Sequence, residues 1–364
     1  MFIFLQYNKF IILRFWEVYF TKDRLTPIIY AILAAVFYAI NTPLSKLLLT
    51  SIPSTFMAAF LYLGAGAGVG IMYVFHWRKE DKTERLGKKD YPYTVGMIVL
   101  DILAPIFLML GIKYGTAANA SLLGNFEIVA TTLIAFVIFR ETVSKRLWTA
   151  IALITISSII LSFEGTGNFQ FSYGSLFVLL ATACWGLENN CTRNISDKST
   201  YEIVVLKGIF SGGGAFVIAL LIGEKLPTFR HIVLAMLLGF MAYGLSIFLY
   251  IRAQRNLGAA KTSAYYAVAP FVGAFLSFIL LGEKLTWTFF VAFFIMMVGT
   301  VFVVMDTMVR HHAHQHTHSF SHTHDGITHN HIVVHSHEHN HYAFNDRHGH
   351  HHSQRELENA IRHS

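Results

Sequence analysis

The chain of 364 residues has few charged side chains and only two cysteines. Asp, Glu, Lys and Arg make up 13% of it, against about 25% in an average soluble domain. This little charge does not cover the surface of a soluble protein of that size, so soluble enzymes and nucleic-acid-binding proteins are strongly disfavoured despite the net charge of +7. Cys184 and Cys191 fall in one apolar run, where a helix separates them by two turns, so no disulfide framework is expected.

What the chain has instead is apolar sequence, with 54% hydrophobic residues. Residues 26–309 are almost continuously apolar, whereas residues 311–364 hold every histidine except His76 and His231. This contrast predicts a membrane body followed by a polar, His-rich cytoplasmic tail over residues 310–364. The composition of the tail predicts disorder in the absence of a ligand, apart from a short helix near residues 354–362.

The body contains runs of about 20 apolar residues, the length that a helix needs to cross a bilayer. Short polar connections separate the runs, which makes neighbouring helices antiparallel. The sequence therefore predicts an all-α membrane protein. Its ten transmembrane helices lie at residues 26–49, 52–76, 92–112, 116–139, 146–163, 174–194, 200–222, 231–251, 259–281 and 286–308.

Residues 1–25 differ from the predicted spans, because their apolar run is interrupted by Lys9, Arg14 and Glu17. The pattern favours an interfacial amphipathic segment over an eleventh span. The segment has no small-residue cleavage site and therefore does not read as a signal peptide. A wrongly assigned start codon remains an alternative.

The lysines and arginines in the connections lie mostly on the same side as the N-terminus, and this bias is strongest in the first half. Because cytoplasmic loops carry an excess of these residues, we expect a multi-pass protein of the plasma (inner) membrane with both termini in the cytoplasm.

The two halves of the body repeat each other. A shift of 142 positions lays residues 115–148 over residues 257–290 without a gap, so that Ser121 meets Ser263 and Glu141 meets Glu283. A shift of 147 positions lays residues 34–41 over residues 181–188. Each half, 26–163 and 174–309, contains five predicted spans. With an odd number of spans the second copy is inverted in the bilayer, an arrangement that places a substrate site near the midplane.

At these residues the chain resembles the drug/metabolite transporter superfamily, specifically its EamA-type ten-helix members. The resemblance is carried by residues 117–121 through Arg140-Glu141-Thr142, by residues 259–263 through Gly282-Glu283-Lys284, by Trp185-Gly186 and by Pro270. The first half departs from the pattern, because Ile128 stands where the second half has Pro270. The resemblance implies two inverted five-helix repeats and transport of a small solute, and it does not identify the solute.

The leading hypothesis is a secondary transporter, an exporter of a small organic metabolite, that works by alternating access with coupling to protons. Two alternatives remain open, a divalent transition-metal transporter that collects ions on its tail and a non-transporting metal sensor or scaffold. An enzyme is not expected, because the spans contain no nucleophile–histidine pair and no phosphate-binding loop. The expected partners are the lipid bilayer and a small-molecule solute, with no nucleic acid and no required cofactor. The oligomeric state is not predicted.

Charged side chains within spans are functional candidates, since each costs a few kcal/mol to place there. Glu127 lies mid-span and can take up a proton or bind a cation, or it is hydrogen-bonded to a neighbouring helix. Glu188 stands at the repeat position of Asn41, where both halves would contribute polar groups, or it pairs with Lys207 or Arg193. Asp101 is predicted to line the transport path. The alternative is that it lies in the cytoplasmic half of its span and is hydrated from that side. Lys207 is expected to extend its ammonium toward the interface.

The remaining substrate or coupling candidates are polar or aromatic side chains close to these charges. They are Asn125, Asn189, Tyr38, Trp185, Tyr243, Tyr265 and Tyr266. Packing is the alternative role for each aromatic residue. Glycine-rich runs at residues 64–68 and 212–214 are predicted to mark close helix contacts.

Histidines alternate with other residues in the tail, and spacing of two places them on one side of an extended strand. Imidazole suits zinc, nickel, copper and cobalt. A divalent transition metal is therefore expected on the tail, bound weakly and interchangeably by His312, His314, His316, His318, His335, His337, His339 and His341.

Overall fold

The computed structural model describes residues 22–76, 85–164, 170–195, 198–257, 262, 265–307, 309–324 and 327–342. The predicted interfacial segment up to residue 21 and the predicted helix at residues 354–362 lie outside these ranges. The chain divides into two compact units, Met1–Val304 and Met305–Ser364.

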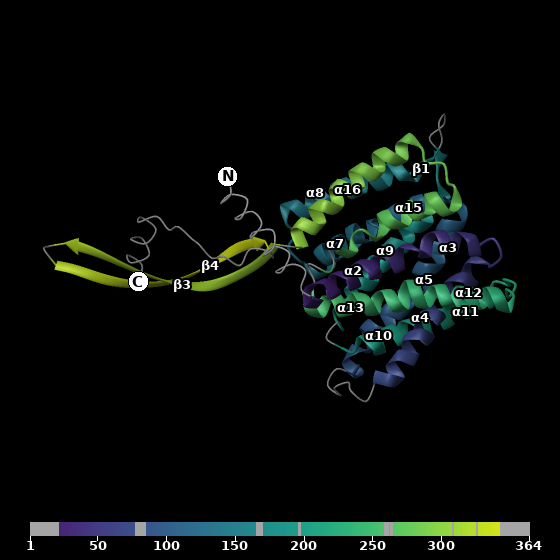
Figure 1. The fold of residues 1–364 in the computed structure, drawn as a ribbon, viewed down its shortest axis with the longest axis horizontal. Helices are drawn as coiled ribbons and strands as arrows, with labels where there is room; N and C mark the ends of the chain where they lie inside the picture. The colour runs from purple at the N-terminus through teal and green to yellow at the C-terminus, as the bar shows by residue number, and fades with distance from the viewer. Residues whose placement is uncertain are drawn as a thin grey trace, which may run out of the picture. The chain divides into compact units, whose positions relative to one another are not determined.

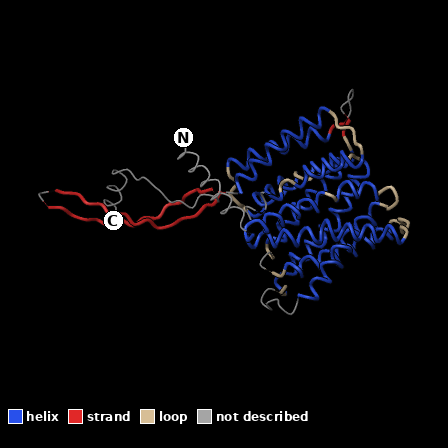
Figure 2. The backbone as a smooth tube through the Cα atoms, in the orientation of Figure 1, coloured by secondary structure: helices blue, strands red, loops and turns tan. Residues whose placement is uncertain are grey.

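The first unit is built from helices (Figures 1 and 2). Their bounds are α2 Lys22–Ala39, α3 Asn41–Leu48, α4 Ser54–His76, α5 Tyr91–Tyr114, α6 Ala117–Leu123, α7 Phe126–Phe139, α8 Lys145–Ser162, α9 Tyr173–Arg193, α10 Thr200–Leu206, α11 Gly212–Leu221, α12 Phe229–Gly239, α13 Ser246–Leu257, α15 Ala269–Leu281 and α16 Trp287–Thr307. A 3₁₀ turn at Lys88–Asp90 precedes α5, and two π-helical segments, Lys207–Ser211 and Phe240–Leu245, join α10 to α11 and α12 to α13.

Eight helical segments in the described residues are long and apolar enough to cross a membrane. Each overlaps one predicted span, and at least one of its ends lies within two residues of the corresponding end of that span. They are Leu25–Leu48, Ser54–His76, Lys88–Tyr114, Ala117–Ile138, Lys145–Ser162, Thr200–Leu221, Phe229–Ala253 and Trp287–Thr307. The sixth and ninth predicted spans correspond to α9, which carries Glu188, Asn189 and Asn190, and to the shorter α15. The multi-pass helical architecture is confirmed, whereas the count of ten spans stays a prediction.

Serine and threonine define where several helices begin. The side chains of Thr116, Ser144, Ser172 and Ser199 each accept a hydrogen bond from the backbone N–H three residues further on. Such caps satisfy N–H groups that have no partner within the first turn of a helix. The sequence therefore sets the start of α6, α8, α9 and α10 locally.

The repeated turn before Glu141 and Glu283 is a helix end in both halves. Arg140 and Gly282, which are repeat mates, both adopt left-handed backbone conformations, with φ of 55° and 63°. A left-handed residue is a common helix terminator, and glycine adopts this conformation without the steric cost that a Cβ adds. A residue in the left-handed conformation thus ends both α7 and α15.

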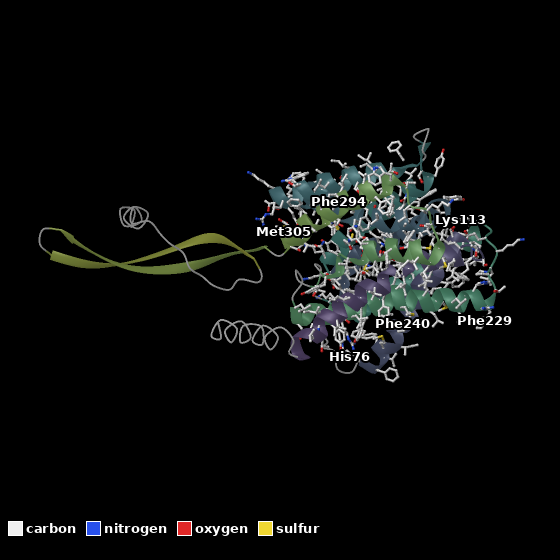
Figure 3. All side chains as sticks on the ribbon, turned by 45° about the horizontal axis from the view of Figure 1, so that its top comes forward. His76, Lys113, Phe229, Phe240, Phe294 and Met305 are labelled. Atoms are coloured by element: carbon white, nitrogen blue, oxygen red, sulfur yellow. The ribbon has the colours of Figure 1, made fainter. Side chains whose placement is uncertain are left out.

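The two repeated turns lie at opposite ends of the bundle. Glu283 contacts the backbone of Ala117 and Ala118 at the start of the Ala117–Ile138 segment, whereas Glu141 follows the end of that segment. Equivalent residues on opposite faces are the signature of an inverted repeat. We call the end that carries Glu283 the Glu283 face and the other end the Glu141 face. Figure 3 shows Lys113 and Phe229 at one end of the bundle and His76 at the other.

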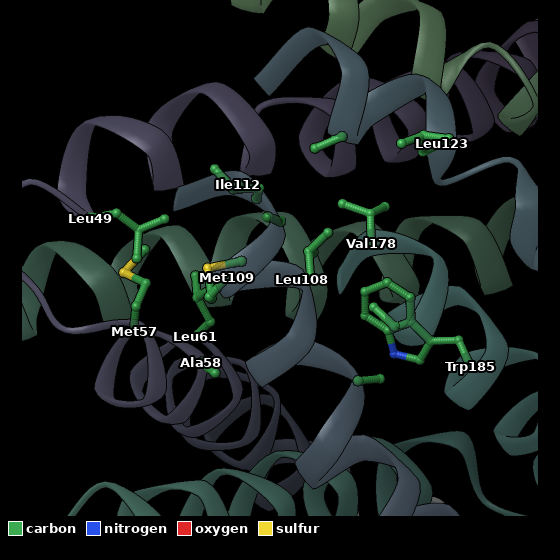
Figure 4. Close-up of a cluster of buried hydrophobic side chains, with 14 of the residues drawn as sticks. Leu49, Met57, Ala58, Leu61, Leu108, Met109, Ile112, Leu123, Val178 and Trp185 are labelled. Atoms are coloured by element: carbon green, nitrogen blue, oxygen red, sulfur yellow. The ribbon is translucent and has the colours of Figure 1, made fainter. Parts of the chain in front are cut away.

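The core lies where α9 packs against α5 and α7, and where α4 packs against the second half. Figure 4 shows part of it, with buried side chains that include Met57 and Leu61 of α4, Leu108 and Ile112 of α5, and Trp185 of α9. The contacts between α5 and α9 join the two halves.

Glycines let α4 approach the second half at backbone distance. A Cβ on Gly66 would lie 2.8 Å from the carbonyl carbon of Gly208, and one on Gly64 would overlap the carbonyl oxygen of Met236. The predicted run at residues 64–68 is therefore a close helix contact. In the run at residues 212–214, Gly212 lies against the backbone of Leu63, whereas a Cβ on Gly213 meets nothing within 4 Å.

Replacing Gly66 with valine is expected to lower the melting temperature of the purified protein by several degrees or to prevent its folding. The added methyl groups meet backbone atoms, which do not rotate away. Gly213→Val is the matched control and should change the melting temperature little. Equal losses for the two variants, measured by thermal unfolding in nanodiscs, would show that helix propensity and not the close contact sets the effect.

The second unit contains strands β3 Val309–His324 and β4 Ile327–Tyr342, which pair antiparallel. These residues are thus paired as a hairpin, whereas disorder of the tail in the absence of a ligand stays a prediction. Alternation with a period of two, which the sequence shows, is also the pattern of a strand. A further short ladder joins β1 Phe163–Glu164 to β2 Gln170–Phe171 between the two halves, and the sequence analysis did not predict it.

Candidate functional site

Helical regularity is interrupted at several levels of the bundle. The first span breaks at Ile40 between α2 and α3, and the fourth breaks at Gly124–Asn125 between α6 and α7. The π-helical segments in the seventh and eighth spans begin at Lys207 and Phe240. Broken helices expose backbone polar groups and frequently carry the binding site in transporters.

Three prolines add to these interruptions. Proline has no N–H to donate to the carbonyl four residues earlier. Pro43, Pro105 and Pro270 therefore withdraw the helical donor from the carbonyls of Ala39, Asp101 and Tyr266. Two of these three carbonyls belong to predicted site residues.

A buried ionic cluster joins the two halves. The Lys207 ammonium lies 3.1 Å from Asp101 Oδ2 and 2.9 Å from Glu188 Oε1. The Asp101 side chain is fully buried and that of Glu188 is 3% exposed. Asp101 belongs to the first half, and Glu188 and Lys207 to the second. Buried charges need such partners, because an isolated charge is costly to remove from water.

Tyr62 links this ionic cluster to an aromatic group. Its hydroxyl donates to Asp101 Oδ1 at 3.1 Å and accepts from Trp185 Nε1 at 3.4 Å. The Tyr62 ring lies 5.3 Å from the ring of Tyr243. The hydroxyl of Tyr243 in turn accepts from Asn41 Nδ2 at 3.1 Å.

The aromatic group continues through three further tyrosines. The centre of the Tyr38 ring lies 5.9 Å from that of Tyr243 and 6.0 Å from that of Tyr266, and Tyr266 lies 5.1 Å from Tyr250. These rings come from α2, the Phe240–Leu245 segment, α13 and the residues that precede α15. Tyrosine faces and hydroxyls together offer an apolar surface with polar positions.

Glu127 belongs to a second polar link between the halves. Its Oε1 accepts from Asn189 Nδ2 at 2.7 Å, and the same amide group donates to Thr131 Oγ1 at 3.2 Å. The interpretation of Glu127 as hydrogen-bonded to a neighbouring helix is thus correct, and the bond connects α7 to α9.

Asn125 lies at the break between α6 and α7, two residues before Glu127. Its side chain is buried, and its amide nitrogen has no hydrogen-bond partner among the described residues. A buried donor without a partner is uncommon and is frequently found where a ligand or water binds.

The structure corrects one expectation about the site. Lys207 does not extend to the interface, because two buried carboxylates hold its ammonium. The side chain of Asp101 is fully buried. Tyr265 makes no hydrogen bond or ring contact with the other predicted site residues in the part of the chain that the structure describes.

Sequence reasoning missed Tyr62 and underrated Lys207. Tyr62 is a single tyrosine inside an apolar span, and nothing in its neighbourhood along the chain distinguishes it from a packing residue. The charge of Lys207 within a span was a signal, but its distance of 106 positions from Asp101 gave no indication of contact.

Two carboxylates of the second half cap helices of the first half at the Glu283 face. Glu283 accepts from the backbone N–H groups of Ala117 at 2.7 Å and Ala118 at 2.9 Å. Glu224 accepts from those of Thr55 at 3.2 Å and Phe56 at 2.9 Å. A carboxylate at a helix N-terminus gains both the hydrogen bonds and a favourable interaction with the helix dipole.

The Glu141 face carries different links. Glu141 forms an ion pair with Arg193, which is exposed, and Glu202 accepts from the backbone N–H of Leu86 at 2.9 Å. Both faces are therefore joined across the two halves, but among the described residues only the Glu283 face is joined by carboxylates that each accept from two helix N–H groups.

Ionic, aromatic and amide groups from both halves of an inverted repeat meet between helices that are broken or irregular, an arrangement typical of membrane transporters. The chain belongs to the EamA-like transporter family of the drug/metabolite transporter superfamily, whose pattern it matches twice, over residues 25–163 and 172–305.

Two relatives are described only as uncharacterized transporters. The chain is 27% identical over 286 residues to an uncharacterized transporter of Methanothermobacter thermautotrophicus. The match covers 71% of this chain and 80% of that protein. It is 23% identical over 207 residues to the uncharacterized transporter YyaM of Bacillus subtilis, over 54% of this chain and 68% of that one. A solved crystal structure of a protein with 15% identity shares the fold, with a TM-score of 0.55 over 75% of this chain and 95% of that one.

Proposed function

We propose that this transporter exports a small organic metabolite by alternating access and couples its movement to protons. The observation that carries the proposal is the set of polar contacts between the halves, in which Asp101 and Glu188 share the ammonium of Lys207, and a third carboxylate, Glu127, accepts from Asn189, the residue after Glu188. This surplus of acidic groups provides a place for a proton or for a cationic group of the solute. The tyrosine rings beside it suit a solute with an apolar body.

Glu127 is the residue that we assign to coupling. Its carboxylate accepts the Asn189 amide hydrogen bond at 2.7 Å, which links α7 of the first half to α9 of the second. A proton on this carboxylate removes its negative charge and weakens a charge-assisted hydrogen bond. Proton uptake then loosens one connection between the halves, which is what coupling to a relative movement of the halves requires.

Replacing Glu127 with glutamine is expected to abolish solute-driven proton movement while leaving solute exchange in place. Glutamine keeps the size and hydrogen-bonding capacity of the side chain but does not titrate. The protein is reconstituted into liposomes that contain a pH-sensitive dye, and amino acids and nucleosides are applied one by one. Exchange is measured separately, as counterflow of the labelled solute.

Glu141→Gln is the control for this experiment, because Glu141 has the same chemistry but lies in an exposed ion pair outside the cluster. It should retain both proton movement and exchange. Proton movement by Glu127→Gln at the rate of the unmodified protein would refute the role of Glu127. Export itself is tested by the solute content of cells that express the protein, which should fall.

The two alternatives that involve metals gain no support from the membrane body. Among the described residues of the membrane body, no group of three or more His, Cys, Asp or Glu side chains is placed to hold a metal ion. The position between Asp101 and Glu188 is taken by the Lys207 ammonium.

A further inference from the structure

The register of the β3–β4 hairpin sorts the tail histidines into cross-strand pairs. His312 stands opposite His339, His314 opposite His337, and His316 opposite His335. Six of the eight predicted metal-binding histidines are thus directly paired. The other two are not, since His318 stands opposite Val333 and His341 opposite Arg310.

The three pairs follow one another on one face of the hairpin. Residues two apart on a strand share a face, and directly opposed residues of an antiparallel pair have Cβ atoms about 4.5–5.5 Å apart. Successive pairs are separated by two residues, or about 7 Å along the strands. Two neighbouring pairs therefore bring together four histidine positions on one face of the hairpin, and four is the number of ligands that a tetrahedral zinc ion takes.

The middle pair is the essential one. His314 and His337 neighbour a pair on either side, whereas the outer pairs are four residues, or about 13 Å, apart and do not share an ion. A site of four imidazoles therefore always includes the middle pair. Without it, no two neighbouring positions of the ladder are both His–His pairs, because the remaining directly opposed pair, His322 and His329, has no such pair beside it.

Metal binding also accounts for a folded hairpin in so polar a segment. An isolated two-stranded hairpin is marginally stable in water, and the composition of the tail predicts disorder. A metal that binds only the paired register adds its binding free energy to the folding of the hairpin.

We propose that the tail is a metal-ordered hairpin with one tight site for a divalent transition metal, formed by His314 and His337 together with one neighbouring pair. The site is distinct from the solute cluster and does not depend on the transport mechanism. Its ligand class is a borderline metal ion that prefers imidazole, such as Zn²⁺ or Ni²⁺.

The test compares two double variants of the full-length protein in nanodiscs. His314→Gln with His337→Gln removes the middle pair. His318→Gln with His341→Gln removes the same number of histidines, one from each strand, but no pair. Binding of Zn²⁺ and of Ni²⁺ is measured by calorimetry, and amide hydrogen exchange of residues 309–342 is measured with and without metal.

The middle-pair variant should bind metal at least about tenfold more weakly, because it loses two of four ligands, and it should lose metal-dependent protection from exchange. The control should keep the affinity and the protection of the unmodified protein. Equal losses for the two variants would overturn the proposal and show a tail that binds metal interchangeably. Unchanged exchange on addition of metal would also overturn it.

Discussion

Replacing Lys207 with methionine is expected to abolish transport and to lower the free energy of unfolding by about 3–5 kcal/mol. The substitution leaves two buried carboxylates, Asp101 and Glu188, without the ammonium that lies within 3.1 Å of both. The two uncompensated carboxylates, one on α5 and one on α9, also repel each other. Thermal unfolding in nanodiscs and solute exchange in liposomes measure the two effects.

A charge-neutral cluster separates stability from function. The triple variant Asp101→Asn, Glu188→Gln, Lys207→Met removes the unpaired charges and should recover much of the lost stability, since a buried ion pair contributes little net stability over neutral replacements. It should not recover transport, because the ionic groups that we assign to the solute site are gone. Lys225→Met, at an exposed lysine, is the control and should behave as the unmodified protein. Full stability of Lys207→Met would contradict this account of the cluster.

Replacing Glu283 with glutamine is expected to shift the protein about tenfold toward a state in which the Glu283 face is open. Glutamine lacks the negative charge that the carboxylate holds against two backbone N–H groups and the N-terminal dipole of α6. A tenfold shift corresponds to about 1.4 kcal/mol. Because these bonds connect the two halves, their loss favours separation at that face.

The shift is measured as a distance between spin labels, without any solute. Labels at Lys113→Cys and Trp287→Cys report on the Glu283 face, in a background with Cys184→Ser and Cys191→Ser. Glu283→Gln should lengthen the distance between them. Glu202→Gln, which removes a carboxylate–N–H bond from the Glu141 face, should not.

A second variant tests the same contact from the helix side. Ala117→Pro removes one of the two N–H donors at the first position of α6, where proline is tolerated. The preceding Thr116 has φ −88° and ψ 147°, a conformation that suits a residue before proline. An unchanged label distance in both Glu283→Gln and Ala117→Pro would show that this contact does not hold the face closed.

Much of the architecture was predictable, because its physical causes are local. A run of apolar residues of bilayer length specifies a span, and eight of the described helical segments coincide with predicted spans. The repeat was visible because Glu141 and Glu283 lie in the same turn, which ends a helix at Arg140 in one half and at Gly282 in the other.

The site was predictable in its charged members and not in its connections. Glu127, Glu188 and Asp101 stood out because a carboxylate within a span is costly. The pairing of Glu188 with Lys207 was one of the two alternatives for Glu188, and the structure shows it. The partners of Asp101 and Glu127 did not stand out, because Lys207 reaches Asp101, and Asn189 reaches Glu127, only through the packing of helices. The tail shows the same limit, since its alternating histidines predicted a strand face but not the partner of each histidine.

The sequence by itself determined that this protein is a multi-pass helical membrane protein with two repeated halves, because hydrophobic length, capping residues and left-handed helix ends act within a few residues. Only the tertiary structure decided that Lys207 is held between two carboxylates, that Tyr62 belongs to the site and that Glu283 caps a helix of the other half. These contacts join residues from different helices, and the geometry that brings them together arises only when glycine-lined helices pack at backbone distance.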